Sequence, residues 1–557
     1  MQAGHGAVLT AMPHAEEGSP RGLLITYAFA VPPLVAYFSM EYGLHEEFHT
    51  YAGGLGILAG DFMKSAGDLN RPVVGIGLRW AQGYTVQRIG SDGHPYDTWR
   101  DFPAGPLRDT GVRVRVRVAA REVECCVWQV GRYAIAPLYL LEAVDERDRW
   151  ITRRLYDPAP DCRIAQEMLL GIGGIRALRA LHLPVDLYHF NEGHAVFAGI
   201  ELIADRIEAG ADFHTAWQEL RKRIVFTTHT PVPAGNEIHA IEDLRRLGAG
   251  CELVSAELSE IGGDPFNMTV AGLRLAHRAN AVAQLHGETA RAMWAGVEEA
   301  APIIAITNGV HRPTWQDPRV AAAADDDALW RVRRQMKDEL LAEVATRTGV
   351  RLDPGALTIG FARRAATYKR PDLLLRDPDR LAPLLKDRRV QLIFSGKAHP
   401  ADQAGKAVVA LLIETIRQWP DSIVFLENYD MELGRLLTRG CDVWLNTPRR
   451  PMEASGTSGM KAAMNGTLNL SILDGWWPEG CEHGVTGWAI GDENVGADQD
   501  ARDLEALYTT LEQEVLPAWG DPARWARMMR ASIRMAVERF SSDRMVDEYF
   551  TRLYTET

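Results

Sequence analysis

Short apolar runs alternate with longer amphipathic stretches along most of this 557-residue chain. Short runs bounded by turn residues predict buried strands, and apolar residues spaced three and four positions apart predict helices. The first half is predicted to contain strands at 34–36, 187–190, 224–227 and 303–306 and a helix over 164–181. Strands that alternate with helices are typical of parallel sheets covered by helices, so the predicted class is α/β.

A second series of the same kind follows the segment 317–327, which is rich in Ala and Asp and lacks apolar periodicity. This segment predicts a domain boundary or a traverse between domains. The strands of the second series are predicted at 357–361, 390–394, 423–426, 443–445 and 468–472. Residues 522–554 show two helical patterns without a strand, which predicts helices that pack across the body.

The length exceeds what one hydrophobic core supports, so two large domains with a cleft between them are expected. The predicted division is 34–316, 317–521 and a tail at 522–557, preceded by a leader at 1–33. The apolar stretch 23–38 is too short for a membrane span, is interrupted by Pro32 and Pro33, and follows no basic region.

Charge and cysteine content limit the possible binding partners and the cellular compartment. The formal net charge is -13, from 61 basic and 74 acidic residues, which argues against a nucleic-acid or anionic-membrane partner. Any anion must therefore be bound locally. The six cysteines show neither zinc spacing nor a disulfide framework, so reduced thiols in the cytoplasm are predicted.

The most informative segment is 453–461, which reads EASGTSGMK between a predicted strand and a predicted helix. Small residues leave backbone N–H groups accessible, and a helix start adds partial positive charge, so an anion can be held here. A lysine after such a cradle can form an imine with a phosphate-bearing aldehyde such as pyridoxal 5′-phosphate. The alternative is that Lys461 is a solvated helix residue.

A basic segment, 361–370 (FARRAATYKR), follows another predicted strand and places four cations at the mouth of the same sheet. Guanidinium groups bind anions in bidentate fashion and lysine acts as a mobile point charge. The alternative is a solvated basic helix start. Cations at a helix N-terminus oppose the macrodipole unless an anion offsets them, which favours a site.

Three other segments carry weaker signals. The glycine loop at 51–60 (YAGGLGILAG) precedes a predicted helix but matches neither the dinucleotide fingerprint nor a P-loop. Residues 189–194 (HFNEGH) and 228–230 (THT) lack zinc-site spacing, so polar loop histidines and no metal are predicted. Trp476 and Trp477 could stack on a sugar, but packing is the commoner role of adjacent aromatics, and no function is assigned to them.

Taken together, these segments resemble the α-glucan (glycogen, starch and maltodextrin) phosphorylase family, and the match is closest to its shorter bacterial and archaeal members. The segment 453–461 followed by Asn465 and Gly466 looks like the family's pyridoxal-phosphate signature. Further matches, in family order, are AYFSMEY at 36–42, the glycine loop, HFNEGH, THT, TNG at 307–309 with Trp315, YKR at 368–370, SGKA at 395–398 and ENY at 427–429.

The resemblance implies the glycosyltransferase B-type architecture, two Rossmann-like domains facing across a cleft. It implies that Lys461 carries the cofactor imine and that Arg364, Lys369 and His229 share the catalytic role with it. The residues implied around the cofactor and the phosphates are Gly54, Trp315, Arg363, Arg364, Lys369, Tyr429 and Thr457. Those implied for the glucosyl unit are His229, Asn308, Glu453, Ser455 and Gly456.

The implied reaction is reversible phosphorolysis of a terminal α-1,4 bond to α-glucose 1-phosphate with retained configuration. The implied partners are α-1,4-glucan and inorganic phosphate, with no nucleic acid or membrane, and a homo-oligomer is compatible with the resemblance. Ala366 and Thr367 stand where the animal enzymes have His-Glu. Two other hypotheses stay open: a nucleotide-sugar-dependent glucan synthase of the same architecture, and a non-catalytic glucan-binding relative.

Overall fold

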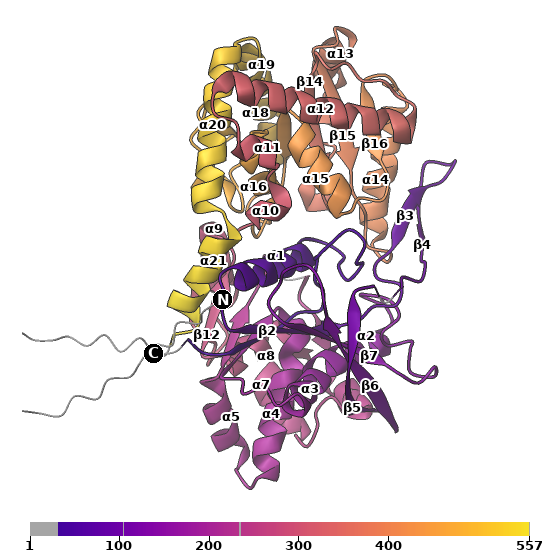
Figure 1. Cartoon of the computed structure of the whole chain (residues 1–557), viewed down its shortest axis with the longest axis vertical. Coiled ribbons are helices and arrows are strands. Elements are labelled where there is room, and N and C mark those ends of the chain that lie inside the picture. The colour runs from indigo at the N-terminus through magenta and orange to yellow at the C-terminus, as the bar shows by residue number, and fades with distance from the viewer. Residues whose placement is uncertain (1–31, 104, 233–234, 556–557) are drawn as a thin grey trace, which may run out of the picture. The chain divides into compact units, whose positions relative to one another are not determined.

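Two large sheets organise the computed structural model, which describes residues 32–103, 105–232 and 235–555 (Figure 1). The predicted leader at 1–33 lies almost entirely outside these residues. The nine strands of the first sheet are, in spatial order, β13 (Ile303–Ala305), β12 (Arg278–Ala281), β9 (Ile224–Thr227), β8 (Leu187–Asn191), β1 (Val35–Phe38), β2 (Val73–Leu78), β7 (Leu138–Ala143), β6 (Arg121–Val130) and β5 (Leu107–Val118).

The second sheet is parallel throughout, as its near-continuous apolar strands predict. Its six strands are, in spatial order, β16 (Ile423–Leu426), β15 (Val390–Ser395), β14 (Leu357–Ala362), β17 (Val443–Asn446), β18 (Leu468–Ile472) and β19 (Gly487–Ile490). Two short two-stranded sheets stand apart from the large ones: the hairpin of β3 (Val86–Ile89) and β4 (Pro95–Thr98), and the pair of β10 (Ile238–His239) and β11 (Phe266–Asn267).

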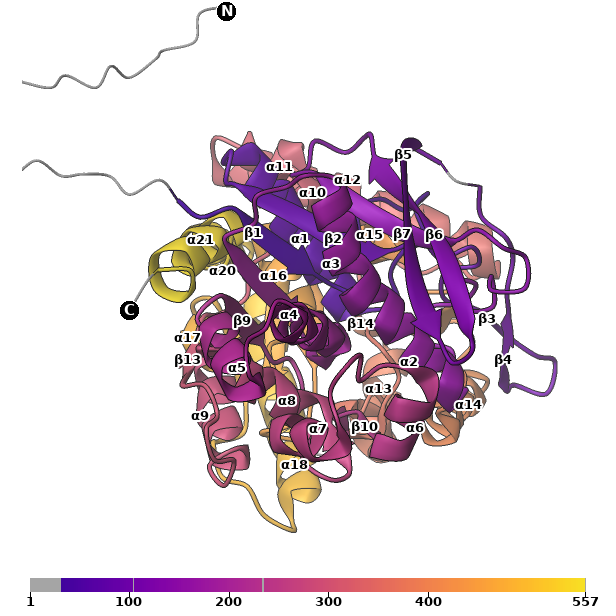
Figure 2. The same cartoon turned by 90° about the horizontal axis from the view of Figure 1, so that it is seen from below.

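Alternate residues of β1 show how the first sheet is buried on both faces. Ala36 and Phe38 belong to a core with helices α3 (Gly174–Ala180) and α4 (Val196–Glu208). Val35 and Tyr37 belong to a separate core with α1 (Gly54–Asp68) and α21 (Ser542–Glu548). Successive side chains of a strand point to opposite faces, so this strand must be covered on both sides. Figures 1 and 2 show α1 and α21 over one face and α3 and α4 over the other.

Helices connect the strands and cover the sheets. In the first half they are α1 (Gly54–Asp68), α2 (Pro160–Met168), α3 (Gly174–Ala180), α4 (Val196–Glu208), α5 (Phe213–Arg221), α6 (Ile241–Leu247), α7 (Ser255–Gly262), α8 (Met268–Leu275), α9 (Gln284–Met293) and α10 (Arg312–Trp315). In the second they are α11 (Pro318–Ala321), α12 (Asp326–Thr348), α13 (Pro378–Lys386), α14 (Gln403–Ile416), α15 (Met431–Gly440), α16 (Thr457–Met464), α17 (Trp477–Gly480), α18 (Gln499–Thr510), α19 (Leu516–Trp519), α20 (Pro522–Arg539) and α21 (Ser542–Glu548).

The strands named from the apolar runs are all present, but the first sheet is mixed. Strands β5 and β6 run antiparallel at its edge and join the parallel part through β7. The predicted helix 164–181 lies within a longer helical stretch, from α2 through a π-helical turn at Leu169–Gly173 to α3. The segment 317–327 holds α11 and the start of α12.

The tail forms the two predicted helices and touches elements of both halves. Helix α20 packs against α16, and α21 packs against α1. The hydroxyls of Ser65 and Ser542 lie 2.6 Å apart, and Arg71 bonds Asp547 at 2.5 Å.

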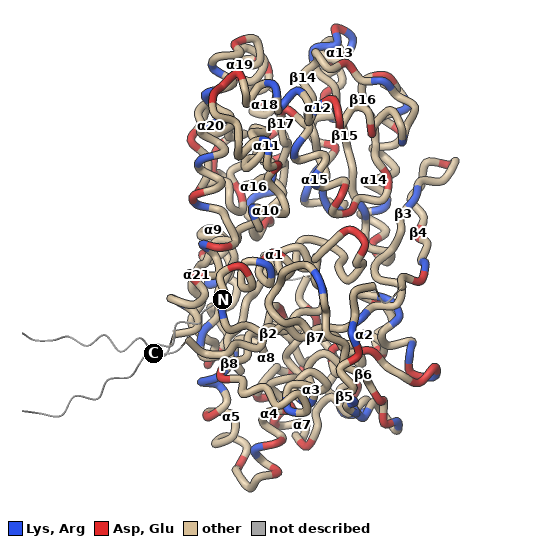
Figure 3. Tube along the Cα trace, in the orientation of Figure 1, with Lys and Arg blue, Asp and Glu red and all other residues tan. Residues whose placement is uncertain are grey.

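Basic and acidic residues are interspersed along the coloured trace of Figure 3. None of the helices in the described part of the chain is long and apolar enough to cross a membrane.

Candidate active site

Strand order places the sequence-predicted segments next to one another. In the second sheet the chain starts at β14, continues outward through β15 and β16, and then returns to β17 on the other side of β14. Ligands in open α/β sheets bind outside the carboxyl ends of the strands at such a switch in strand order. The basic segment follows β14 and the segment 453–461 follows β17, so both meet at this switch.

Glu453 joins the two segments directly. Its Oε2 accepts hydrogen bonds from Arg363 Nη2 at 2.6 Å and from Lys369 Nζ at 2.7 Å. Burial raises the pKa of Glu453, but the two cations outweigh burial and hold the pKa below its usual value. The buried carboxylate is therefore ionised and paired with two charges.

Lys461 lies in α16, which begins after Gly456 in a left-handed conformation with φ +84°. The Lys461 ammonium sits 3.6 Å from the centroid of the Trp315 ring, and the residue is only 7% exposed. Asp61 fixes that ring by accepting a 2.8 Å bond from its indole N–H. Burial lowers the pKa of Lys461 to about 8, although the charge of Asp61 raises it. The predicted alternative of a solvated lysine is therefore wrong.

The four predicted cations of the basic segment do not share one role. Arg364 is exposed, and within the described chain its guanidinium makes no ion pair or hydrogen bond. Arg370 is 1% exposed and bonds Asp503 at 2.6 Å and Asp500 at 2.8 Å, together with two backbone carbonyls. The expectation that Arg370 faces the anion is wrong, because two aspartates of a following helix already neutralise it.

The glycine loop approaches from the first half. A Cβ atom added at Gly53 or Gly54 would meet no atom within 4 Å, so open space faces the start of α1. Glu41 supports the loop from behind, because its carboxylate accepts the N–H groups of Ala52 at 2.5 Å and Gly53 at 3.0 Å. Ile57 of α1 shares an apolar cluster with Trp315, so the loop lies beside Lys461's helix. Glu41 was not predicted as a site residue, although it lies in the matched segment 36–42.

His229 is held in a buried polar network at the end of β9. Its Nε2 lies 2.6 Å from Asn191 Oδ1, and its backbone N–H bonds Glu192 at 3.0 Å. Burial lowers the pKa of His229 to about 3, so the imidazole is neutral at physiological pH. Glu192 has a positive φ of 79°, a strained conformation for a non-glycine residue that is typical of functional sites.

His286 lies within electrostatic range of both His229 and Glu453 and was not predicted from the sequence. This histidine is 1% exposed, and its Nδ1 accepts the backbone N–H of Val282 at 3.2 Å. Burial lowers its pKa to about 4, while the negative charge of Glu453 acts in the opposite direction. A protonated His286 would in turn depress the pKa of His229. The three side chains thus belong to one electrostatic environment.

Two predicted sugar-binding atoms have no partner. Ser455 Oγ and Asn308 Oδ1 are buried and make no hydrogen bond to any residue that the structure describes. Buried polar atoms are nearly always bonded, so these two unpartnered oxygens are available to a ligand. Tyr429 is half-buried. Burial raises the pKa of its phenol, and the positive charge of Arg363 lowers that pKa. Thr457 occupies the first position of α16.

The other aromatic and histidine residues named from the sequence have protein neighbours that account for them. Trp476 and Trp477 are 2% and 1% exposed and pack in an apolar cluster, consistent with the absence of an assigned role. The prediction of a loop histidine is wrong for His189, because it is a fully buried residue of strand β8. Its Nδ1 lies 2.6 Å from the Tyr554 hydroxyl and its Nε2 lies 2.7 Å from the Thr227 hydroxyl. Glu167, Glu237 and His239 have the mutual spacing of metal ligands, but Arg163 already binds both oxygens of Glu237, at 2.5 and 2.9 Å.

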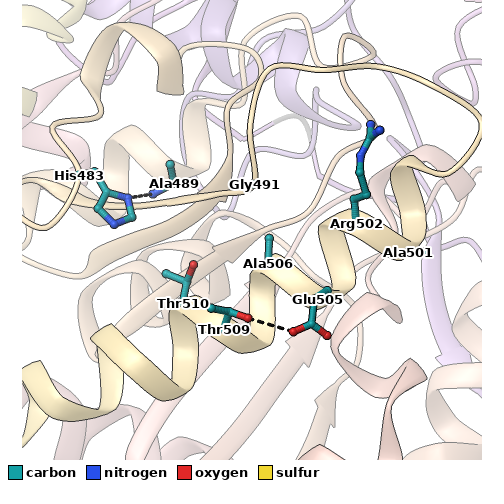
Figure 4. A pocket seen from close by; sticks show the side chains of 9 residues that line it. All are labelled: His483, Ala489, Gly491, Ala501, Arg502, Glu505, Ala506, Thr509 and Thr510. Atoms are coloured by element: carbon teal, nitrogen blue, oxygen red, sulfur yellow. Dashed lines mark hydrogen bonds between the residues drawn. The ribbon is translucent and has the colours of Figure 1, made fainter.

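An open pocket of about 630 Å³ lies elsewhere, against α18 (Figure 4). It is lined by His483, Ala489, Gly491, Ala501, Arg502, Glu505, Ala506, Thr509 and Thr510. No residue predicted for the site lines it, so it is separate from the chemistry described above.

Comparison with known proteins identifies the family. The carbohydrate phosphorylase family profile matches residues 317–481. A glycogen phosphorylase of Mycobacterium tuberculosis is 42% identical over 618 aligned positions, covering 95% of this chain and 71% of the relative. The chain belongs to the α-glucan phosphorylase family.

Two further members of the family are similar over nearly the whole chain. A maltodextrin phosphorylase of Thermococcus litoralis is 40% identical, covering 94% of this chain and 70% of the relative. A glycogen phosphorylase of Aquifex aeolicus is 36% identical, covering 94% of this chain and 86% of the relative. The resemblance inferred from the motifs is thereby confirmed, and so is its bacterial and archaeal character.

Proposed function

We propose that this protein is an α-1,4-glucan phosphorylase, a glycosyltransferase that transfers a terminal glucosyl unit to inorganic phosphate and releases α-glucose 1-phosphate with retained configuration. Family membership supports the reaction class. The observation that carries the proposal is the contact of Glu453 with Arg363 and Lys369, at the start of the segment that ends in a buried Lys461, which forms no ion pair within the described chain.

The proposed architecture is the glycosyltransferase B type, with Rossmann-like domains at 34–316 and 317–521 and a tail at 522–557 that crosses back. In its support, the strands of the two sheets fall on either side of residue 317, and the tail helices touch α1 and α16. The glycine loop would then bring the first domain to Arg363, Arg364 and Lys369 of the second, which form the cation cluster.

Pyridoxal 5′-phosphate is the proposed cofactor, and the site has the features that such a group requires. A lysine with a pKa near 8 is neutral in an appreciable fraction of molecules and can attack an aldehyde. Trp315 would flank the cofactor at Lys461. The residues proposed around its phosphate are Gly54, Arg363, Lys369, Tyr429 and Thr457. When bound, the group supplies a phosphate with a second pKa of about 6, able to exchange a proton with the substrate phosphate.

The cations of the site have two proposed tasks. Arg363, Arg364 and Lys369 would offset the repulsion between two neighbouring phosphates and orient the substrate phosphate towards the sugar. This phosphate would donate its proton to the glycosidic oxygen as the C1–O bond breaks, and its oxygen would then bond C1 on the same face. Retention of configuration follows from attack on that face.

The glucosyl unit would be held by side chains from both halves. Ser455 and Asn308 offer the unpaired oxygen atoms described above, and Glu453 can accept sugar hydroxyls while it stays ionised. The neutral imidazole of His229 and the backbone at Gly456 would complete the proposed set of groups that bind the glucosyl unit. The substrates are thus α-1,4-glucan and inorganic phosphate.

A cytoplasmic location is proposed on the basis of six thiols that are all free. Self-association stays a prediction.

The decisive assay mixes the purified protein with maltodextrin and inorganic phosphate and measures glucose 1-phosphate. The proposal predicts its release in a pyridoxal-phosphate-dependent manner, and glucan extension when glucose 1-phosphate is supplied instead. Glucan extension that requires a nucleotide sugar would favour the synthase, and glucan binding without turnover would favour the non-catalytic relative.

A further inference from the structure

Lys397 stands at the same sheet edge as the cation cluster, although the proposed mechanism does not use it. It follows β15, which lies next to β14, and the Ala365 N–H donates to the Lys397 carbonyl at 2.9 Å. The loop that carries Lys397 therefore runs alongside the loop that carries Arg364. Both side chains start from the carboxyl ends of neighbouring parallel strands, where ligands of such sheets bind.

The Lys397 ammonium has no counter-charge in contact. Its two hydrogen-bond partners are the neutral oxygens of Thr85 (backbone, 3.2 Å) and Asn428 (Oδ1, 3.3 Å). Three other partly or fully buried lysines differ in this respect: Lys337, Lys369 and Lys406 each lie 2.6 to 2.7 Å from a carboxylate. Lys64, which bonds the Thr314 hydroxyl, and Lys461, which lies over Trp315, resemble Lys397 in contacting no carboxylate of the described chain. A cation withdrawn from water without an ionic partner is costly unless something else supplies the negative charge.

Arg364 and Lys397 also share one neighbour. The Lys397 Nζ lies 5.9 Å from the centroid of the Tyr84 ring. Burial raises the pKa of Tyr84, and the positive charge of Arg364 opposes that rise, so Arg364 also lies within electrostatic range of this phenol. Two cations that contact no carboxylate, from adjacent strand ends, therefore lie near Tyr84. Asp430 and Asp97 act on Lys397 only through their charge, without a hydrogen bond or ion pair to it.

We propose that Lys397 is a further ligand of the substrate phosphate, which it binds together with Arg364. The inference rests on the proposed function, because it deepens the description of the same site. The Thr85 carbonyl comes from the segment just before the β3–β4 hairpin, so the hairpin's base would hold the ammonium in place. The hairpin does not depend on Lys397 for its attachment: Gln87 exchanges two hydrogen bonds with Ala398, and Asp97 pairs with Lys406.

The hairpin offers a matched control. Lys406→Met removes a lysine of similar burial that anchors the hairpin, but outside the cation cluster. Lys397→Met is expected to raise the KM for inorganic phosphate about 10- to 100-fold, the effect of losing one charged hydrogen bond, with the KM for maltodextrin unchanged within about twofold. Lys397→Arg should recover part of the phosphate affinity, and Lys406→Met should leave both KM values within about twofold.

A phosphate KM of Lys397→Met within twofold of wild type would overturn the inference. If the KM values for phosphate and for maltodextrin rise in parallel in Lys397→Met, and rise likewise in Lys406→Met, the inference is also overturned and Lys397 serves to anchor the hairpin.

Wild-type protein provides a second measurement that does not depend on the folding of a variant. Cyanate carbamylates lysines, and the modified positions are mapped by mass spectrometry. Inorganic phosphate should slow carbamylation of Lys397 but not that of Lys406. Equal protection of the two lysines, or no protection of Lys397, contradicts the proposal. If wild-type protein lacks phosphorolysis yet phosphate protects Lys397, the proposed function fails and the anion site stands.

Discussion

The hydroxyl of Ser455 is buried without a hydrogen-bond partner in the described structure, a cost that a ligand would remove. Ser455→Ala is therefore expected to leave the free energy of unfolding unchanged or slightly higher. It should raise the KM for maltodextrin about 2- to 10-fold, which corresponds to one neutral hydrogen bond. Steady-state kinetics and urea denaturation measure the two effects.

Ser532 supplies the control for this prediction, because its hydroxyl is also buried and unpartnered but lies in the tail helix α20. Ser532→Ala should leave the KM unchanged. A loss of stability in Ser455→Ala without a change in KM would show that the hydroxyl serves the fold rather than the sugar.

At the level of single residues, the sequence identifies side chains whose neighbours in the chain already carry chemistry. Lys461, Glu453 and Arg363 lie in short segments whose glycines and cations predict anion binding. The basic segment 361–370 does not reveal that Arg370 binds Asp500 and Asp503, because those aspartates follow about 130 positions later in the chain. Glu41 and His286 escape prediction for the same reason: their partners become neighbours only through the fold.

At the level of elements, apolar runs predict the buried strands well and the exposed edge poorly. Strand β5 alternates outward Arg113, Arg115 and Arg117 with buried Val114 and Val116. This alternation is typical of an antiparallel strand with one face in water, whereas the apolar-run criterion selects strands buried on both faces. The carboxyl ends of the central strands were therefore predictable, and the edge of the first sheet was not.

His189 links the central strands to the tail and gives an element-scale prediction. Burial lowers its pKa to about 3, so the folded protein holds it neutral, while the unfolded chain protonates it near pH 6.5. Its stabilising contribution is complete above pH 6.5 and is lost as pH falls towards 3. The stability advantage of wild type over His189→Gln should shrink by about 2 kcal/mol between pH 7.5 and 5.

Urea denaturation of both proteins at several pH values measures this difference. Tyr554→Phe is the control, because it removes the hydroxyl that bonds His189 but keeps the imidazole. Tyr554→Phe should lower stability while its pH dependence stays parallel to that of wild type. A pH-independent difference between wild type and His189→Gln would contradict the account.

At the level of the whole molecule, contacts between distant segments assemble the site. Glu479 of α17 accepts hydrogen bonds from the Gln284 N–H at 2.9 Å and the Thr307 hydroxyl at 2.7 Å, next to Asn308. Ile57 of α1 packs in one apolar cluster with Met460 of α16. Both sheets thus contribute to the surroundings of Lys461, and a variant that disturbs either sheet is expected to affect the same chemistry.

Covalent mapping of Lys461 tests the central claim most directly. Purified protein is incubated with pyridoxal 5′-phosphate, reduced with borohydride, digested and analysed by mass spectrometry, with Lys461→Arg in parallel. The account predicts a single pyridoxyl group on the peptide that contains Lys461, and none on the corresponding peptide of the variant. A folded wild-type protein that releases glucose 1-phosphate while Lys461 stays unmodified would contradict it.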